Sequence, residues 1–272
     1  MCGSIVRWLV DAVNQFKSII ACLVMGALGA CASVAPITPD LADHAVDINS
    51  TTWAKASGVI AHEGLLPQPQ WQNFHLPGKR ATHYLPATQS EGRIAIKAHA
   101  QSAASMLRLR VKVLATDIGR VRFSWKVQDL VVSADMGDRE KDDAPVRTVF
   151  AFDGDRSLFS LKNTLMSELS HSLTGEPMPY AVLMYVWSKT RPIGTVIHSP
   201  RTDRIRKIVI ESGSQHLNEW RVYERDLKAD FETAFHEPAG NLVGIGIMTD
   251  TDNTQSTVQS HYGPLTISLK TP

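Results

Sequence analysis

Apolar and polar residues alternate along several segments of the chain after Trp71. In residues 106–114, MLRLRVKVL, leucine or valine fills every second position, with arginine or lysine between them. The same alternation recurs in residues 121–127 and 264–270. Successive side chains of a strand point to opposite faces, so each segment is predicted to be a half-buried β-strand. Residues 180–187, YAVLMYVW, are apolar throughout, which predicts a central strand covered on both faces.

Two segments have the period of an amphipathic helix instead. Between residues 157 and 171, the apolar stripe consists of Leu158, Leu161, Leu165 and Leu169. In residues 226–236, DLKADFETAFH, it consists of Leu227, Phe231, Ala234 and Phe235. Asp226 is the expected N-cap of the second helix, and Thr51 or Thr52 is the expected cap of a short helix near the start of the domain.

These elements together predict the fold class. About ten short strands, two short inserted helices and no alternation of strands with helices are typical of an antiparallel sandwich. We therefore expect an all-β, mainly antiparallel, jelly-roll-like β-sandwich. It should form a single domain over residues 51–272.

The N-terminal segment has the pattern of a signal peptide. Arg7 and Lys17 precede an apolar run that is shorter than the roughly 20 residues of a transmembrane helix. The run ends in Leu28-Gly29-Ala30-Cys31, which resembles a bacterial lipobox. That resemblance implies a leader over residues 1–30, lipidation of Cys31 and a tether over residues 31–50. The alternative is an ordinary secretory signal cut near Ala30 or Ala32.

The cysteine content and the net charge limit which disulfides and which partners the protein can have. The three cysteines are Cys2, Cys22 and Cys31, so the predicted domain has no internal disulfide. The net charge is +1, which argues against nucleic acid as the main partner. The expected partner is a membrane, bound through the lipid anchor. Ala32 beside the cysteine is similar to lipoproteins of the outer membrane that face the periplasm.

The strand segments also carry a family resemblance. Pieces such as FSWKV, KDDAPVRTVFAF, YAVLMYVW, ERDLKADFETAF and GIGIMTDTDNT followed by HYGPLTI stand in order between Trp71 and Leu269. In these pieces the chain resembles the bacterial domain-of-unknown-function family 3047 (DUF3047). The resemblance implies a secreted or lipid-anchored envelope protein and brings no established activity. The final Tyr-Gly strand is also similar to those of carbohydrate-binding jelly rolls.

Carboxylates are the main candidates for catalysis. The chain has no G-x-S-x-G, H-E-x-x-H or glycine-rich phosphate motif. A glycosidase needs two carboxylates about 5–10 Å apart across a sugar. The candidates are Asp143, Glu176, Asp250 and Asp252, and the alternative for the loop around Asp143 is a solvated turn.

Aromatic residues are the candidates for binding. Trp71, Tyr223 and Tyr262 could stack on sugar rings, whereas Trp125 and Trp187 are in phase with core positions.

The polar stretch at residues 248–263, MTDTDNTQSTVQSHYG, has several possible roles. It lacks the glycine and glutamate positions of an EF-hand loop. Asp250 and Asp252 could still bind Ca²⁺ or take part in catalysis. Together with Asn253 they could also bind a ligand or cap a turn. We favour the capping role and expect no other cofactor.

The functional prediction is non-catalytic ligand binding in the envelope, with a glycan as the leading ligand. The alternatives are a carboxylate-dependent glycan hydrolase or lyase and a scaffold for another envelope protein.

Overall fold

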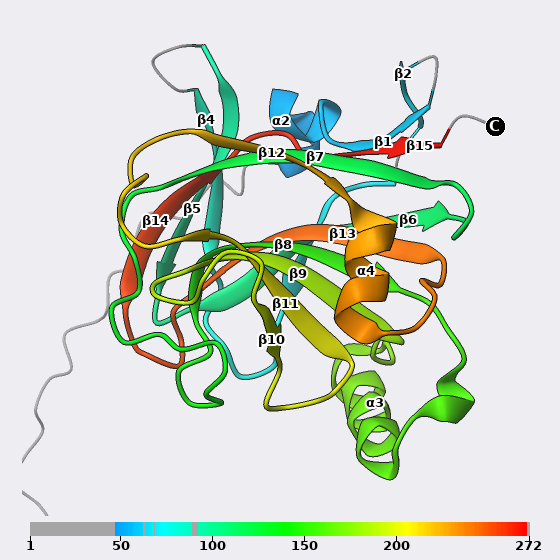
Figure 1. The fold of residues 1–272 in the computed structure, drawn as a ribbon. Helices are drawn as coiled ribbons and strands as arrows, with labels where there is room; N and C mark the ends of the chain where they lie inside the picture. The colour runs from blue at the N-terminus through cyan, green and yellow to red at the C-terminus, as the bar shows by residue number, and fades with distance from the viewer. Residues whose placement is uncertain (1–46, 62–63, 68, 89–91, 271–272) are drawn as a thin grey trace, which may run out of the picture. The chain divides into compact units, whose positions relative to one another are not determined.

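The structure is a computed structural model that describes residues 47–61, 64–67, 69–88 and 92–270. Two β-sheets face each other across a shared core, and helices lie at their margins (Figure 1). The predicted leader, most of the tether and Cys31 lie outside the described residues, so lipidation stays a prediction. None of the described helices is long and apolar enough to cross a bilayer.

The first sheet has the strand order β2-β1-β15-β7-β14-β5-β4, and β12 pairs with the free side of β7. Its strands are β1 (Gly58–Ala61), β2 (Gly64–Leu65), β4 (His83–Thr88), β5 (Ile94–Gln101), β7 (Ile118–Val127), β12 (Arg221–Asp226), β14 (Thr257–Tyr262) and β15 (Thr266–Leu269). β7 is a central strand of this sheet: its first half pairs with β15, and its second half pairs with β14.

The second sheet has the order β10-β11-β9-β8-β13-β6-β3. Its strands are β3 (Gln72–His75), β6 (Ala104–Val113), β8 (Ala144–Phe152), β9 (Ala181–Ser188), β10 (Val196–His198), β11 (Ile205–Ser212) and β13 (Leu242–Asp250). Among the described strands, only β1 with β15 and β9 with β11 pair in parallel. The prediction of an all-β, mainly antiparallel, jelly-roll-like sandwich is therefore confirmed.

Sequence periodicity placed the core correctly in the strands. The alternating segments form β6, β7 and β15, and their apolar sides turn to the core. Residues 180–187 supply β9, which is an interior strand as predicted. Trp125 and Trp187 are fully buried, which confirms their assignment to the core.

The helical elements are η1 (Ile48–Ser50), α2 (Thr52–Lys55), η2 (Arg156–Leu158), α3 (Leu161–Thr174) and α4 (Leu227–Phe235). Thr51 caps α2 and Asp226 caps α4, as predicted. α4 packs on β7, β11 and β12 and closes one end of the sandwich (Figure 1). Its whole apolar stripe is buried, and the Phe231 ring is stacked on Phe235 and tilted against Phe152.

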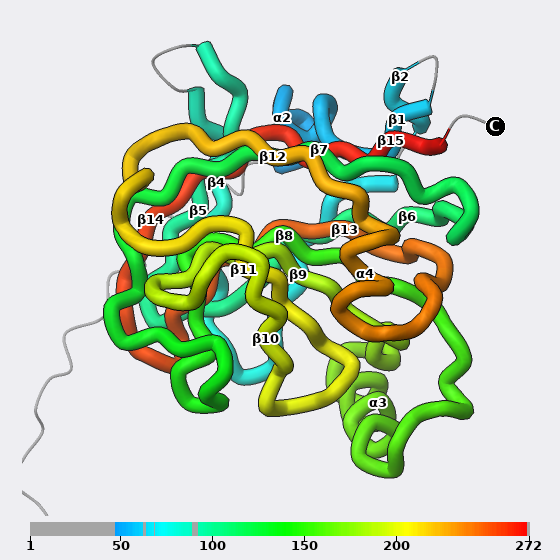
Figure 2. The backbone as a smooth tube through the Cα atoms, viewed as in Figure 1, coloured from blue at the N-terminus to red at the C-terminus, as the bar shows by residue number. Residues whose placement is uncertain are grey.

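α3 is a helix as predicted, but its apolar stripe does not face the core. Leu158 and the four leucines of α3 are 58–76% exposed. The inward side of the helix carries Asn163 and Ser167, which are buried. The Asn163 amide donates to Asp203 at 2.6 Å and accepts from the Thr202 hydroxyl at 2.7 Å. These polar bonds hold the helix with its leucines outward, at the opposite end of the domain from α2 (Figure 2).

Candidate functional site

The loop between β13 and β14 is held by a buried carboxylate from another strand. Asp143, just before β8, is almost fully buried. It accepts hydrogen bonds from the Asn253 amide at 3.2 Å, the Thr254 amide at 2.7 Å and the Thr254 hydroxyl at 2.6 Å. The Asn253 side chain donates in turn to the Arg139 carbonyl at 3.1 Å. Asp143 therefore acts as the clamp of this loop.

Asp250 belongs to a buried network of charges. Its carboxylate accepts from the Ala144 amide at 3.0 Å and from Arg147 Nε at 2.8 Å. Arg147 also donates to Asp142 at 3.1 Å, and Asp142 accepts from the Lys207 ammonium at 2.6 Å. Burial raises the pKa of Asp250 to about 6 against the opposing charge of Arg147. Burial likewise lowers the pKa of Lys207 to about 8. Each charged group of this network has a partner of opposite sign within the network.

Three of the predicted acids come together, and we tested whether they fit a metal ion. Carboxylate oxygens of Asp143, Asp250 and Asp252 lie within 4.8 Å of one another. However, Asp143 holds amides and a hydroxyl, Asp250 holds Arg147, and Asp252 pairs with Lys79. Each of the three carboxylates is thus engaged by protein donors, two of them by a cation, so the contacts fit a loop clamp better than a Ca²⁺ site.

The fourth predicted acid stands elsewhere and is fully engaged. Glu176 follows α3 and accepts two hydrogen bonds from Arg108, at 2.8 and 2.7 Å, and one from Arg110. The bond from Arg108 lowers the pKa of Glu176, which opposes a role as proton donor. The cavity beside Asp143 has a volume of about 60 Å³, far below the roughly 300 Å³ of a small ligand pocket. The cavity at Asp143 therefore has no room for a sugar ring.

Two of the three predicted binding aromatics are core residues. Trp71 is 5% exposed and packs on Trp53, with ring centroids 4.7 Å apart. Tyr262 is 1% exposed and donates its hydroxyl to the Met248 carbonyl at 2.6 Å. Their ring faces are covered by protein, which corrects the expectation that they stack on a ligand. Tyr223 is the one that keeps partial exposure.

Tyr223 lies between two arginines of β12, on the side of that strand that faces the second sheet. The alternation of β12 turns Arg221, Tyr223 and Arg225 to the same side of the strand. The Tyr223 hydroxyl donates to Glu211 of β11 at 2.8 Å, and Arg221 Nε donates to the same oxygen at 3.1 Å. Glu211 is buried, whereas Arg221 keeps about a third of its side chain exposed.

The same arrangement occurs a second time beside it. The Tyr185 hydroxyl of β9 donates to Asp230 of α4 at 2.6 Å. Arg225 donates to both oxygens of Asp230, at 2.9 and 2.7 Å. Each carboxylate thus holds one tyrosine and one arginine. We call these residues the seam: Tyr185, Glu211, Arg221, Tyr223, Arg225 and Asp230.

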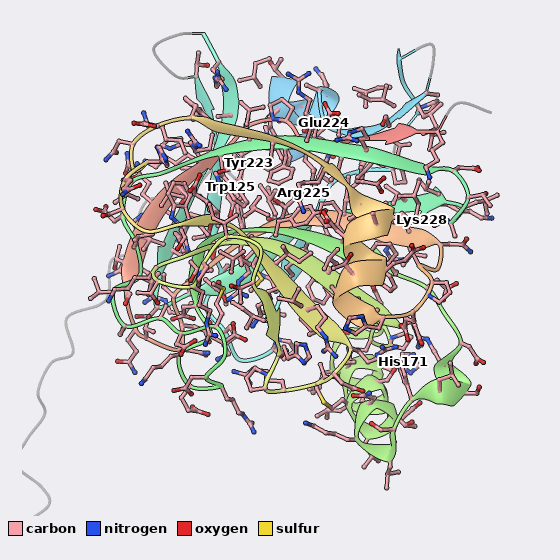
Figure 3. All side chains as sticks on the ribbon, in the orientation of Figure 1. Trp125, His171, Tyr223, Glu224, Arg225 and Lys228 are labelled. Atoms are coloured by element: carbon pink, nitrogen blue, oxygen red, sulfur yellow. The ribbon has the colours of Figure 1, made fainter. Side chains whose placement is uncertain are left out.

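An aromatic stack links the two halves of the seam. The Phe123 ring is stacked on Tyr185 at 5.5 Å and on Tyr223 at 5.4 Å. Trp125 packs on Tyr223 from the side, at 5.4 Å. Figure 3 shows Trp125, Tyr223 and Arg225 in the space between β12 and the second sheet. Arg221 and Arg225 are each bonded to a carboxylate and keep 36% and 39% of their side chains exposed.

The chemistry of the seam suits recognition rather than proton transfer. Burial and Glu211 raise the pKa of Tyr223, so its hydroxyl stays protonated and remains a donor to Glu211. Sequence reasoning missed the other members of the seam. The alternation of RVYER could have placed Arg221 and Arg225 on the face of Tyr223, but nothing in the sequence pairs them with Glu211 and Asp230.

Comparison with known proteins gives a family and several remote structural likenesses. Residues 69–266 match the family described as "Protein of unknown function (DUF3047)". No curated protein matches the chain.

The solved structures share only 7–9% identity with the chain. The xyloglucanase domain of NopAA from Sinorhizobium fredii, in complex with cellobiose, has a TM-score of 0.40 over 74% of this chain and 93% of that one. The endo-1,4-β-glucanase CelB2 has a TM-score of 0.40 over 74% and 97%. SGBP-B from a xyloglucan utilization locus of Bacteroides uniformis has a TM-score of 0.29 over 74% and 47%. These likenesses are too remote to assign a ligand or a reaction.

Proposed function

The chain belongs to the DUF3047 family, and from this premise we propose that it is a non-catalytic binding protein that holds a glycan along the seam. The observation that carries the proposal is the pair of partly exposed arginines, Arg221 and Arg225, each bonded to a carboxylate and on the same side of β12 as Tyr223. Fixed donors beside aromatic faces are the groups that orient a polar ligand, because little side-chain entropy is lost on binding.

The acids of the chain support binding over hydrolysis. A glycosidase needs one carboxyl group with a raised pKa that faces the same sugar as a second carboxylate. Asp250 has the raised pKa, but it is enclosed by Arg147 and Ala144. Glu211 and Asp230 face the seam, but each is occupied by an arginine and a tyrosine hydroxyl.

A glycan array with the purified protein, followed by calorimetry, tests this function. We expect at least one oligosaccharide to bind without release of a product. Arg225→Gln should weaken binding about ten-fold or more, because a hydrogen bond to a charged group contributes roughly 1.5–3 kcal/mol. Arg120→Gln is the matched control, since Arg120 pairs with Glu224 outside the seam. Equal loss in both variants, or product in the mixture, contradicts the proposal.

The exposed leucines of α3 favour a second candidate function, that of an assembly protein. Leu161, Leu165, Leu169 and Leu173 form one i, i+4 ridge that is symmetric about its midpoint. A two-fold axis through that midpoint sets the ridge against itself, and ridges of this kind interlock between helices. The occupant that we infer is therefore a second copy of the chain.

Sedimentation velocity tests self-association through α3. The ridge is small beside the roughly 800 Å² per partner of a standard interface, so we expect a weak dimer. Leu165→Glu should abolish the dimer, whereas the same change at Leu114, an exposed leucine outside α3, should leave it intact. A wild-type protein that stays monomeric at high concentration, or binds vesicles through this face, contradicts the idea.

We infer that the protein acts in the bacterial envelope, anchored in the outer membrane through Cys31. The lipobox-like end of the leader supports this proposal. Intact mass spectrometry of the membrane-bound protein should show a lipid mass that Cys31→Ser lacks. A wild-type protein without lipid, or one found in the inner membrane, contradicts the corresponding part.

A further inference from the structure

The outer face of the first sheet carries a row of basic residues on three adjacent strands. β14 lies between β5 and β7, and the strand register sets His261 directly beside Lys97 on one side and Lys126 on the other. Adjacent strands are about 4.8 Å apart, so the row spans roughly 10 Å. The backbone positions of two lysines are thus fixed on either side of His261.

The row points away from the core. The neighbouring positions on the same strands, Ile96, Tyr262 and Trp125, are buried between the sheets. Because side chains alternate along a strand, Lys97, His261 and Lys126 occupy the opposite face. Both lysines are partly exposed there, although His261 itself is only 5% exposed.

An aromatic residue and a third cation complete the surface. The indole of Trp220, just before β12, lies over His261, with ring centroids 6.4 Å apart. The Arg93 guanidinium carbon is 4.9 Å from the centre of the Trp220 ring. Trp220 therefore fixes Arg93 beside the row without neutralising its charge, since an indole is not an anion.

The three cations have no acidic partner among the described residues. Arg93, Lys97 and Lys126 are absent from the ion pairs of residues 47–61, 64–67, 69–88 and 92–270. The acid next to Trp220 in sequence, Glu219, is bonded to His216 at 3.1 Å. This contrasts with the seam, where each arginine holds a carboxylate.

An unpaired polar atom of His261 is a second, independent observation in favour of a ligand at this surface. Its Nδ1 atom is buried and has no hydrogen-bond partner in the described part of the chain. Burial, with the charges of Lys126 and Lys97, lowers the pKa of His261. Three neighbouring cations without a counter-charge repel one another, and an anion placed among them removes that repulsion.

We propose that the surface formed by Arg93, Lys97, Lys126, Trp220 and His261 binds the anionic group of an acidic glycan. Its carboxylate or phosphate lies between the two lysines, and its sugar ring lies against the edge of Trp220. The glycan part of this inference rests on the proposed function. The anion site itself does not, because it follows from the unpaired cations on the sheet.

Calorimetry with the purified protein tests the inference with three probes: an oligogalacturonate, a neutral oligosaccharide of equal length and inorganic phosphate. We expect the oligogalacturonate to bind at least ten-fold more tightly than the neutral sugar and to weaken as salt rises. The double variant Lys97→Gln/Lys126→Gln should lose that preference. The control, Lys112→Gln, removes a lysine of the second sheet and should keep it.

The outcomes separate this inference from the proposed function. Equal binding of acidic and neutral sugars, or a preference that survives the double lysine variant, overturns the anion site while the glycan function stands. Binding of phosphate alone, lost in the double variant, supports the anion site and overturns its glycan ligand. A wild-type protein that binds none of the three probes overturns the inference, and the array decides the function separately.

Discussion

Helices α3 and α4 have similar sequence patterns and opposite orientations. Both carry an apolar stripe at helical spacing and both begin at a capping side chain, Ser160 in α3 and Asp226 in α4. α4 buries its stripe between the sheets, whereas α3 turns its leucines to solvent. The comparison shows that an apolar period predicts a helix but does not by itself say which side of the helix is covered.

The neighbours of each helix explain the difference. α4 packs on β7 and β11, and its Phe231 ring packs against Phe152, the last residue of β8. α3 instead meets a polar loop, where Asn163 satisfies Asp203 and Thr202. A buried amide with partners on both of its polar atoms is costly to turn outward, because those partners would lose their hydrogen bonds.

Removing the anchor of α4 should give the largest effect. Phe231→Ala leaves a cavity in the core and should lower the free energy of unfolding by about 3–5 kcal/mol. Urea denaturation followed by circular dichroism measures the change. A loss below about 1 kcal/mol would mean that α4 is not part of the core as the structure shows it.

Removing Asn163, the buried residue that holds α3, should destabilise the protein less. Asn163→Ala leaves Asp203 and Thr202 without a partner and should destabilise the protein by about 1–3 kcal/mol. Hydrogen exchange should then rise in residues 161–174 before it rises in the strands. Uniform exchange, as in the wild type, would show that other contacts hold α3.

The N-caps of α3 and α4 should contribute nearly equally to the stability of the protein, which sharpens the comparison of the two helices. Asp226→Ala and Ser160→Ala each remove a bond to a main-chain amide, and each should cost about 1 kcal/mol. Thermal unfolding of both variants provides the measurement. A much larger effect at Asp226 would indicate that the cap is coupled to the packing of α4.

The exposed leucines should give the smallest effect on stability. Leu165→Gln keeps a good helix former at an exposed position, so the free energy of unfolding of the monomer should change by less than about 0.5 kcal/mol. Dilute samples in the same urea assay keep any self-association out of the result. Destabilisation close to that of Phe231→Ala would place the stripe of α3 in the core after all.

The candidate site shows the same division between local and tertiary information. The sequence pointed to Tyr223 as a partly exposed aromatic residue, and the alternation of β12 contains its neighbours Arg221 and Arg225. It also pointed to Trp71 and Tyr262, which are core residues, because a lone aromatic residue has no periodic neighbours that reveal its face. Glu211 and Asp230 come from β11 and α4, so only the packing of these elements joins them to the seam.

The sequence by itself determined the elements of this protein: its alternating strands, its two helices, the Asp226 cap of α4 and the all-β class. These follow from contacts between residues close in the chain, where the period of side chains is fixed by backbone geometry. The tertiary structure decided what each charged or apolar face meets. It enclosed Asp143 and Asp250 among hydrogen-bond donors and turned the leucines of α3 outward. It also left Lys97 and Lys126 without an acidic partner among the residues that the structure describes. Such outcomes depend on desolvation and pairing between distant segments, and those energies exist only once the sheets are packed.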